Sequence, residues 1–417
     1  MTSETAESPI AADLVDERLI GRGGVTGGAR SLWNRIRGGD LGMLPVIIGL
    51  IVISLVFYAM EPIFLSSRNL VSITQFAAPV GIIALGIVLV LLLGEIDLSV
   101  GSVSGMAAAV MAVVVVRQGH DMALGLVAGI LSGLAVGLFY AILYNAFGIP
   151  SFVFSLAGLL GFEGVLYLVL GKEGSINLPE GSNFVQYVRY EYLPQGAAYA
   201  LVVLLSVGYL TSRSLASRSR ERAGLSSLWM PGVLIKAGLM LVGLLFATYY
   251  LYIDRGWGYL WVFFVLLVMI VDFALRRTTW GRHVFAIGGS EDAARRAGIK
   301  VGRTYVSVFV MCSTLAALGG LLAAAQVTSV SQSSGTGDTN LTAIAAAVIG
   351  GTSLFGGRGS AWSALLGILV LKAIQSGLNM VGVDSSSVRL IVTGGVLLLA
   401  VAVDSKARQA RESSGRG

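Results

Sequence analysis

The stretch LVLLLGEIDLSVGSVSG, residues 89–105, places Glu95 and Asp97 directly after an uninterrupted apolar run. If this run crosses a membrane, an ionised carboxylate near its middle costs about 2.5–3.5 kcal/mol on insertion scales. Two such groups should therefore face protein or a water-filled cavity. The glycines and serines that follow disfavour a continuous helix. The stretch predicts a helix broken within the membrane, with its carboxylates turned away from lipid.

The composition supports a membrane setting. Of 417 residues, 55% are hydrophobic, 12% are charged and 55 are glycine. Several apolar runs approach the roughly 20 residues that cross a bilayer, and small residues let membrane helices approach closely. We expect an all-α polytopic membrane protein. The single cysteine, Cys312, excludes an intrachain disulfide, and the separated His120 and His283 disfavour a metal or Ser/His catalytic site.

The chain contains about twelve hydrophobic segments. They lie at 43–60, 72–93, 101–116, 122–147, 151–170, 197–212, 232–252, 258–275, 305–326, 341–356, 361–380 and 388–403. Arginine and lysine are concentrated in the amino-terminal tail, the 213–231 and 276–304 loops and the carboxyl tail, which predicts that these parts are cytosolic. The 171–196 and 327–340 loops are acidic or lack basic residues, which predicts that they are external. Twelve crossings with both termini inside are consistent with the predicted side of every loop. This topology explains the formal charge of +6 better than nucleic-acid binding does, because the basic residues gather on one side of the membrane.

These features divide the chain into a cytosolic disordered tail at 1–42, a transmembrane domain at 43–404 and a cytosolic tail at 405–417. Within the first tail, ARSLWNRIRGGD (29–40) sets apolar residues against arginines. This pattern fits either a short helix on the membrane surface or a solvated basic tail.

The broken stretch has an echo in AAAVIGGTSLFGGRGSAWSALLG, residues 345–367. Paired short, interrupted segments in the two halves of a transporter indicate a translocation centre. Eight segments separate the two breaks, so both run in the same direction and the predicted repeat is parallel. The candidate residues of the two breaks are Gly94, Glu95, Asp97, Ser99, Gly101 and Ser102, and Gly350, Gly351, Thr352, Ser353, Gly357, Arg358, Gly359 and Ser360.

The carboxylates of the first break have two alternative roles. In the structural one, they cap the helix that follows Ser99 and pair with a cation, for which Arg358 is the obvious candidate. In the functional one, they contact a substrate or a coupling ion. A second intramembrane pair, Glu163 with Lys372, is predicted from their similar depth in two segments of the same direction. The alternative is that each faces an aqueous path alone or becomes neutral.

Two further patterns concern helix packing. Gly125, Gly129, Gly133 and Gly137 recur every four residues and make one bare helix face suited to close helix contact. IGGSEDAARRAGIKVGRT (287–304) reads as a short helix between membrane segments. Ser290 is its N-cap, acidic Glu291 and Asp292 come first, basic Arg295 and Arg296 come last, and Gly298 ends it. So short a helix must dock on another surface.

Three motifs carry a resemblance to a known family. DAARRAG (292–298) resembles the loop by which permeases of ATP-binding-cassette (ABC) importers dock into their ATPase subunit. GEIDLSVGS (94–102), FAIGGSEDAARRAGI and AAAVIGGTSLFGGRGS resemble the permeases of bacterial ribose and xylose importers, over roughly residues 60–405. The two additional segments and basic loop at 197–257 most resemble the longer D-xylose permeases. That family has an arginine where Glu163 stands here.

The resemblance implies a non-enzymatic subunit in the bacterial inner membrane that passes a monosaccharide, D-xylose above all, inward by alternating access. Its implied partners are an extracytoplasmic sugar-binding protein, a second permease chain, most simply a copy of this one, and a cytosolic ATPase that holds ATP and Mg²⁺. The sequence has no G-x-x-x-x-G-K-[ST] motif. The implied coupling helix comprises Ser290, Glu291, Asp292, Ala293, Ala294, Arg295, Arg296 and Gly298.

A neutral sugar requires hydrogen-bonding groups along its path. The candidates are Gln75, Asn145, Gln326, Gln375 and Asn379, for which polar contacts between helices are the alternative role. The 171–196 loop is a candidate docking surface for the sugar-binding protein, or a lid. The rival function is an ion-coupled secondary transporter in which Asp97 or Glu95 binds the ion, although such a carrier has no use for a coupling helix.

Overall fold

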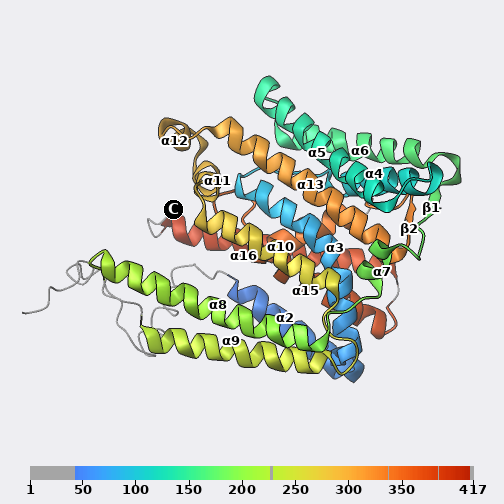
Figure 1. Cartoon of the computed structure of the whole chain (residues 1–417). Helices are drawn as coiled ribbons and strands as arrows, with labels where there is room; N and C mark the ends of the chain where they lie inside the picture. The colour runs from blue at the N-terminus through green and yellow to red at the C-terminus, as the bar shows by residue number, and fades with distance from the viewer. Residues whose placement is uncertain (1–42, 226–228, 337, 384, 414–417) are drawn as a thin grey trace, which may run out of the picture. The chain divides into compact units, whose positions relative to one another are not determined.

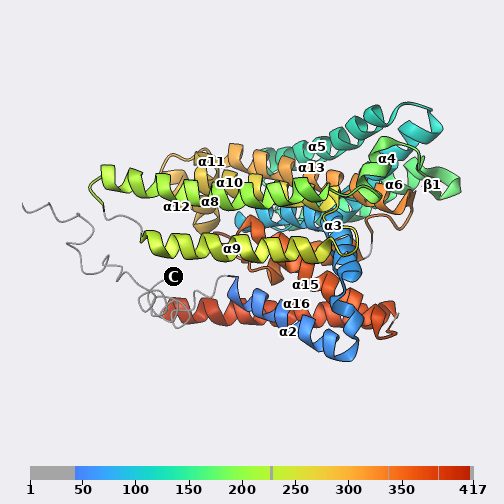
Figure 2. The same ribbon diagram turned by 60° about the horizontal axis from the view of Figure 1, so that its bottom comes forward.

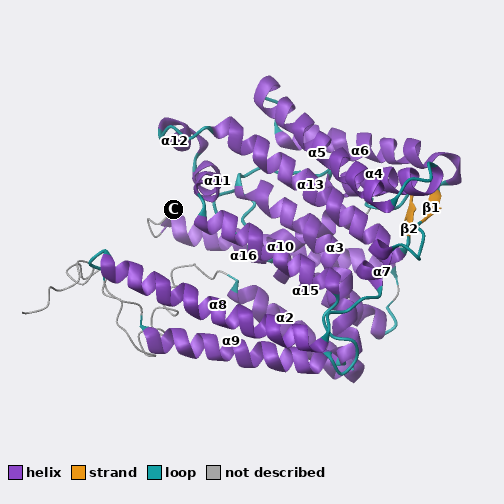
Figure 3. Ribbon diagram, in the orientation of Figure 1, coloured by secondary structure: helices purple, strands orange, loops and turns teal. Residues whose placement is uncertain are grey.

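The computed structural model describes residues 43–225, 229–336, 338–383 and 385–413, and they are almost entirely helical (Figure 3). The chain divides into a larger unit, residues 42–192 and 257–409, and a smaller unit that contains residues 193–256. The helices of the larger unit are α2 (Leu44–Met60), α3 (Ser67–Leu92), α4 (Val100–Ala112), α5 (Met122–Phe147), α6 (Ser151–Leu170), α7 (Asn183–Arg189), α10 (Tyr259–Arg277), α11 (Thr279–Gly289), α12 (Glu291–Arg296), α13 (Val301–Val327), α14 (Asp338–Ile349), α15 (Ala361–Met380) and α16 (Ser386–Ser413).

Local signals in the sequence explain where these helices begin and end. α5 begins where the Asp121 carboxylate accepts a hydrogen bond from the Leu124 N–H at 2.7 Å, and it ends at Gly148 in the left-handed conformation. Ser66 caps α3 in the same way through the Asn69 N–H. α4 continues beyond Ala112 as a π-helical turn, Val113–Arg117. The interruption of the apolar run after Leu92 also matches the sequence, because Gly94 adopts a positive φ of 83°.

The larger unit is built around α13. This helix of 27 residues, about 40 Å long, packs against α3, α4 and α5. In Figure 1 it runs from α12 at one end to strand β2 (Ser329–Ser331) at the other. It is buried along much of its length, including Cys312 near its middle. α13 therefore defines two opposite ends of the unit and a scale of depth between them.

The glycines of α5 form its contact surface with α4 and α13. A Cβ atom added at Gly133 would lie 2.6 Å from the Ser313 carbonyl oxygen, and one at Gly137 would lie 2.8 Å from that of Phe309. At Gly129 the Ala107 carbonyl oxygen of α4 would be 3.0 Å away. The prediction that this glycine face serves close helix packing is confirmed.

The end of the larger unit opposite α12 is closed by a two-stranded antiparallel sheet. β1 (Ser175–Asn177) pairs with β2, and Ile176 lies opposite Val330. The strands come from the two loops that were predicted to be external, and the structure brings them to one end of the molecule. Nearby, Arg117 forms an ion pair with Glu173 at 3.0 Å and donates to the Leu170 carbonyl at 2.5 Å.

The smaller unit is a hairpin of α8 (Gln195–Arg222) and α9 (Met230–Leu251), which lie side by side in Figures 1 and 2. Its open end is tied by the Tyr252 hydroxyl, which donates to the Leu193 carbonyl. In the larger unit, Tyr192 and Gly258 form a β-bridge. The chain therefore leaves and re-enters the larger unit at neighbouring points, and the hairpin is a single insertion.

Of the described helices, nine are long and apolar enough to cross a membrane, and α2 and α14 are shorter apolar helices. The all-α polytopic class is confirmed, whereas the count of twelve crossings and the parallel repeat stay predictions. α16 covers the twelfth predicted segment but continues to Ser413, beyond the predicted boundary at 404. The predicted surface helix at 29–40 lies outside the described residues.

Candidate functional site

The first break connects α3 to α4 and rises along α13. Glu95 Oε1 lies 3.3 Å from the Tyr305 hydroxyl near the start of α13, and Asp97 Oδ2 lies 3.9 Å from Cys312 Sγ. Tyr305 and Cys312 are seven residues, or about 10 Å, apart along the axis of α13, so the break extends from near the start of this helix to its middle. α4 therefore begins well inside the length of α13, as expected for a helix interrupted within the membrane.

Asp97 is held by its own turn. Asp97 is only 1% exposed, and its Oδ1 accepts from the Ser99 N–H at 2.8 Å and from the Ser99 hydroxyl at 2.7 Å. The Tyr140 hydroxyl of α5 in turn donates to Ser99 Oγ at 2.7 Å. These bonds fix the entry to α4, which is the structural role considered for this carboxylate.

Neither carboxylate pairs with Arg358. That side chain is exposed, and the ion pairs between described residues do not join it to Glu95 or Asp97. The expectation that Arg358 neutralises the first break is wrong, because hydroxyl and backbone donors already satisfy both carboxylates. The same turn continues into α4, where the Gly101 N–H donates to Asn340 Oδ1 at the start of α14. Ser102 is buried beside it.

The second break, residues 350–360, lies against the first. The Gly357 N–H donates to the Leu92 carbonyl at 2.9 Å. Gly356 has a φ of 83°, and a Cβ added there would lie 2.7 Å from the Gly288 carbonyl and 2.9 Å from the Gly94 nitrogen. Only glycine allows this three-way approach of the two breaks and α11.

Other predicted residues of the second break shape its backbone. Gly351, Gly357 and Gly359 adopt positive φ, the Ser353 N–H donates to the Arg358 carbonyl at 3.0 Å, Thr352 is buried, and Gly350 packs against the Ser363 carbonyl of α15. Ser360 caps α15 through the Trp362 N–H at 3.3 Å, and its hydroxyl also accepts from Arg276 at 3.1 Å. The break is therefore anchored to the end of α10.

The short helix α12 forms where the sequence predicts it. Ser290 Oγ accepts from the Ala293 N–H at 3.3 Å, and the chain turns at Gly298 with a φ of 81°. Ala294 is buried against the membrane helices. The rest of its surface is open: Asp292, Ala293, Arg295, Arg296 and Gly298 are exposed. α12 is thus a docked helix whose outer face carries charged side chains.

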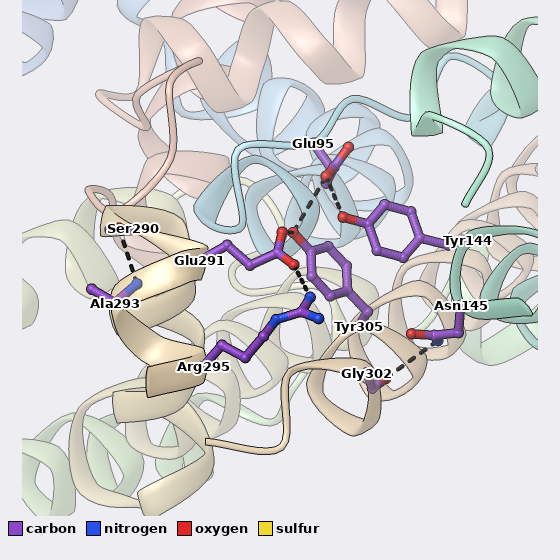
Figure 4. Close-up of polar contacts among 9 residues, drawn as sticks. All are labelled: Glu95, Tyr144, Asn145, Ser290, Glu291, Ala293, Arg295, Gly302 and Tyr305. Atoms are coloured by element: carbon purple, nitrogen blue, oxygen red, sulfur yellow. Dashed lines mark hydrogen bonds and ion pairs between the residues drawn. The ribbon is translucent and has the colours of Figure 1, made fainter. Parts of the chain in front are cut away.

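One charged residue of α12, Glu291, also faces inward. Glu291 Oε2 lies 3.3 Å from the Tyr305 hydroxyl, the same hydroxyl that contacts Glu95, and its Oε1 accepts from Arg295 at 2.5 Å (Figure 4). Glu95 also accepts from the Tyr144 hydroxyl at 3.0 Å and from Ser151 at 2.5 Å. α12 and the first break therefore meet at a single tyrosine.

Tyr140, Tyr144, Ser151 and Tyr305 were not predicted as site residues. Tyr140 and Tyr144 are four residues apart on α5, so they share one helix face. The Tyr144 hydroxyl donates to Glu95, and the Tyr140 hydroxyl donates to Ser99, which itself bonds Asp97. Hydroxyl-bearing aromatics at this spacing beside an acidic break are the signal that would have indicated them.

The predicted Glu163–Lys372 pair does not form. Glu163 accepts from Tyr167 on its own helix at 2.5 Å, and the Lys372 ammonium donates to Gln375 Oε1 at 2.9 Å. α6 packs on α4 and α5, whereas α15 packs on α2, α3, α10 and α14. The prediction is wrong because similar depth did not imply adjacent helices.

Lys372 instead lines a cavity of about 280 Å³ between α3 and α15. Five of its seven lining residues are polar or charged, and the full lining comprises Ser72, Ile73, Phe76, Lys372, Gln375, Ser376 and Asn379. Gln375 and Asn379 are four residues apart on α15 and share this cavity, and their role in a sugar path stays a prediction. Gln75 is buried, and neither polar atom of its carboxamide has a hydrogen-bond partner among the described residues. Asn145 donates to the Ala141 and Gly302 carbonyls at 3.0 and 3.3 Å, which is the helix-contact role (Figure 4). Gln326 is half-buried near the end of α13.

Known permeases are similar to this chain over most of its length. Residues 69–401 match the family described as branched-chain amino acid transport system / permease component. The chain is 33% identical to the xylose transport system permease protein of Haemophilus influenzae over 366 residues, 87% of this chain and 96% of that protein. It is 32% identical to the Escherichia coli protein of the same name over 371 residues, 89% and 93% of the two chains.

A more distant relative is the ribose import permease protein of Bacillus subtilis, 29% identical over 359 residues, or 86% of this chain and 91% of that protein. No solved structure matches the chain. The ion-coupled alternative finds no support among these relatives. The family match and the extended similarity to xylose permeases show that this multi-pass inner-membrane protein belongs to the permease subunits of ABC importers, on the xylose and ribose branch, whose ATP is hydrolysed by a separate subunit.

Proposed function

We propose that this permease passes a pentose, D-xylose before D-ribose, into the cell by alternating access driven by its ATPase partner. The greater similarity to xylose permeases supports the order of the two sugars. The inserted α8–α9 hairpin supports it as well, because this insertion is the feature by which the sequence resembles the longer xylose permeases.

The observation that carries the proposal is the placement of α12. A docked helix with an exposed charged face provides a surface for the ATPase, and its inner face touches the break of the membrane helix through Tyr305. A displacement of α12 thus has a direct route to both breaks. In this arrangement the α12 end is cytosolic, with both termini on that side, and the β1–β2 end receives the sugar-binding protein.

The cavity between α3 and α15 is the proposed sugar station. Asn379 and Ser72 make no side-chain hydrogen bond with described residues and are available to sugar hydroxyls, while Phe76, 53% exposed, provides an apolar ring face. A charged Lys372 side chain in lipid would be energetically costly, which supports an aqueous cavity. The cavity lies toward the external end, because Ser72 is near the start of α3 and Asn379 near the end of α15.

We propose that two permease chains form the pathway and that the second chain is a copy of this one. The 171–196 segment is proposed to dock the sugar-binding protein, because β1 anchors it beside β2 at the external end. Two identical chains would present two such surfaces.

The test is sugar-dependent ATP turnover of the purified complex of permease, ATPase and sugar-binding protein. Xylose is expected to stimulate turnover at lower concentration than ribose, and glucose and arabinose to stimulate least. Asn379→Ala is expected to raise the xylose concentration needed for half-maximal stimulation about five-fold, the loss of roughly one hydrogen bond to a neutral ligand. Stimulation by ribose alone would contradict the assignment of xylose, and stimulation by none of these sugars would contradict the proposed function.

A further inference from the structure

We infer that Tyr305 is the positioning residue that transmits the displacement of α12 to the first break, by exchanging its one hydroxyl hydrogen bond between Glu291 and Glu95. The inference rests on the proposed function and adds the residue through which coupling passes. The juxtaposition that carries it is one phenol oxygen at 3.3 Å from a carboxylate of α12 and at 3.3 Å from a carboxylate of the break (Figure 4).

A tyrosine hydroxyl has one hydrogen to donate. Two carboxylates face the Tyr305 oxygen, so at any moment only one of them receives that hydrogen bond. The other carboxylate then faces only the lone pairs of the Tyr305 oxygen and lies near a second negative charge, which is unfavourable. The hydroxyl therefore has two alternative arrangements, one bonded to Glu291 and one bonded to Glu95. Any shift of α12 changes the relative stability of these two arrangements.

The Tyr305 ring is held in place by packing, whereas its two hydrogen-bond partners belong to α12 and to the first break. Tyr305 is 2% exposed and stacks on Tyr144, with ring centroids 4.1 Å apart and an interplanar angle of 26°, and on Phe309 at 6.1 Å. Phe309 also contacts Phe154 of α6 edge-on. Because the ring is enclosed, the hydroxyl oxygen stays fixed on α13 and only its O–H direction changes.

Each carboxylate has a separate anchor for its remaining bonds. Glu95 keeps Tyr144 and Ser151, so it remains bonded when Tyr305 turns away. Glu291 keeps Arg295, whose side chain is 67% exposed on the outer face of α12. A partner that binds Arg295 from the cytosolic side draws it from Glu291, which then depends on Tyr305. Binding of a partner to the exposed face of α12 is thus linked to the buried hydrogen bond of Tyr305.

The experiment compares Tyr→Phe variants in the reconstituted complex, because phenylalanine retains the ring and its packing. The measured quantity is sugar transported per ATP hydrolysed, with complex assembly checked by size-exclusion chromatography. Tyr305→Phe is expected to lower this ratio by about five-fold or more, the lower limit of a typical coupling between sites. Tyr144→Phe removes a hydrogen bond from the same Glu95 carboxylate but keeps the link to α12, so its loss is expected to be smaller. Tyr167→Phe, which breaks the remote bond to Glu163, is the control and is expected to retain the wild-type ratio.

A double-mutant comparison separates coupling from general damage. Glu291→Ala combined with Tyr305→Phe is expected to lower the ratio no further than Tyr305→Phe alone, because each change removes one partner of the same hydrogen bond. Equal ratios for wild type and Tyr305→Phe would overturn the inference, as would an equal loss in Tyr144→Phe or additive losses in the double variant. A wild-type complex that does not couple ATP to sugar uptake would instead contradict the proposed function itself.

Discussion

At the scale of single residues, the two carboxylates of the first break have different environments although they are two positions apart. Asp97 is buried in a turn closed by Ser99 and Tyr140, whereas Glu95 faces α12 through Tyr305. The sequence predicted that both avoid lipid, which is what their hydrogen bonds achieve. It did not predict their partners, because a cation was expected where Glu95 accepts from hydroxyl groups of α5, α6 and α13 and Asp97 accepts from Ser99.

Replacement of Asp97 distinguishes its structural role from ion binding. Asp97→Ala leaves the buried N–H and hydroxyl of Ser99 without their acceptor, and we expect a loss of about 1–3 kcal/mol of stability. Asp97→Asn keeps an acceptor oxygen and is expected to retain most of both stability and transport. Thermal unfolding in detergent measures the first quantity, and uptake the second. An Asp97→Asn variant of normal stability that does not transport sugar would favour the alternative role, direct contact with substrate or ion.

At the scale of helices, periodicity and end signals predicted most of the elements. The Ser290 cap, the charges of α12 and the bare face of α5 all appear where their patterns indicate, because each depends on residues within a few positions. Neighbours across the fold were less predictable. Glu163 and Lys372 are at similar depth in parallel segments, yet their helices pack on different partners. The sequence of one segment does not indicate which helix lies beside it.

The glycine face of α5 allows a matched test. In Gly133→Ala, the added Cβ would lie 2.5 Å from Ala317 Cβ and 2.6 Å from the Ser313 carbonyl, so α5 and α13 must separate. We expect a loss of roughly 1–3 kcal/mol, seen as a lower thermal unfolding temperature. Gly161→Ala on α6 is the control, because a Cβ there meets nothing within 4 Å. It is expected to be neutral or slightly stabilising through helix propensity. Equal destabilisation by both variants would show that α5 does not depend on this contact.

At the scale of the whole molecule, the larger unit has two functionally distinct ends joined by α13. The β1–β2 end unites the two loops that lack a basic excess, and the opposite end gathers α12 and both breaks. Exposed basic residues lie at the ends of α10 and α12 and at the start of α13 at that second end, among them Arg277, Arg296, Lys300 and Arg303. This distribution agrees with the positive-inside rule and supports the proposed orientation.

We propose that this chain is a sugar pathway opened from its α12 end by another subunit's ATP hydrolysis. The most direct measurement is sugar uptake into proteoliposomes that contain the permease with its ATPase partner and sugar-binding protein. We expect uptake that requires ATP on the α12 side and persists with an ionophore, and no uptake by the permease alone under an ion gradient. Uptake by the permease alone on an ion gradient, abolished by the ionophore and indifferent to ATP, would contradict it.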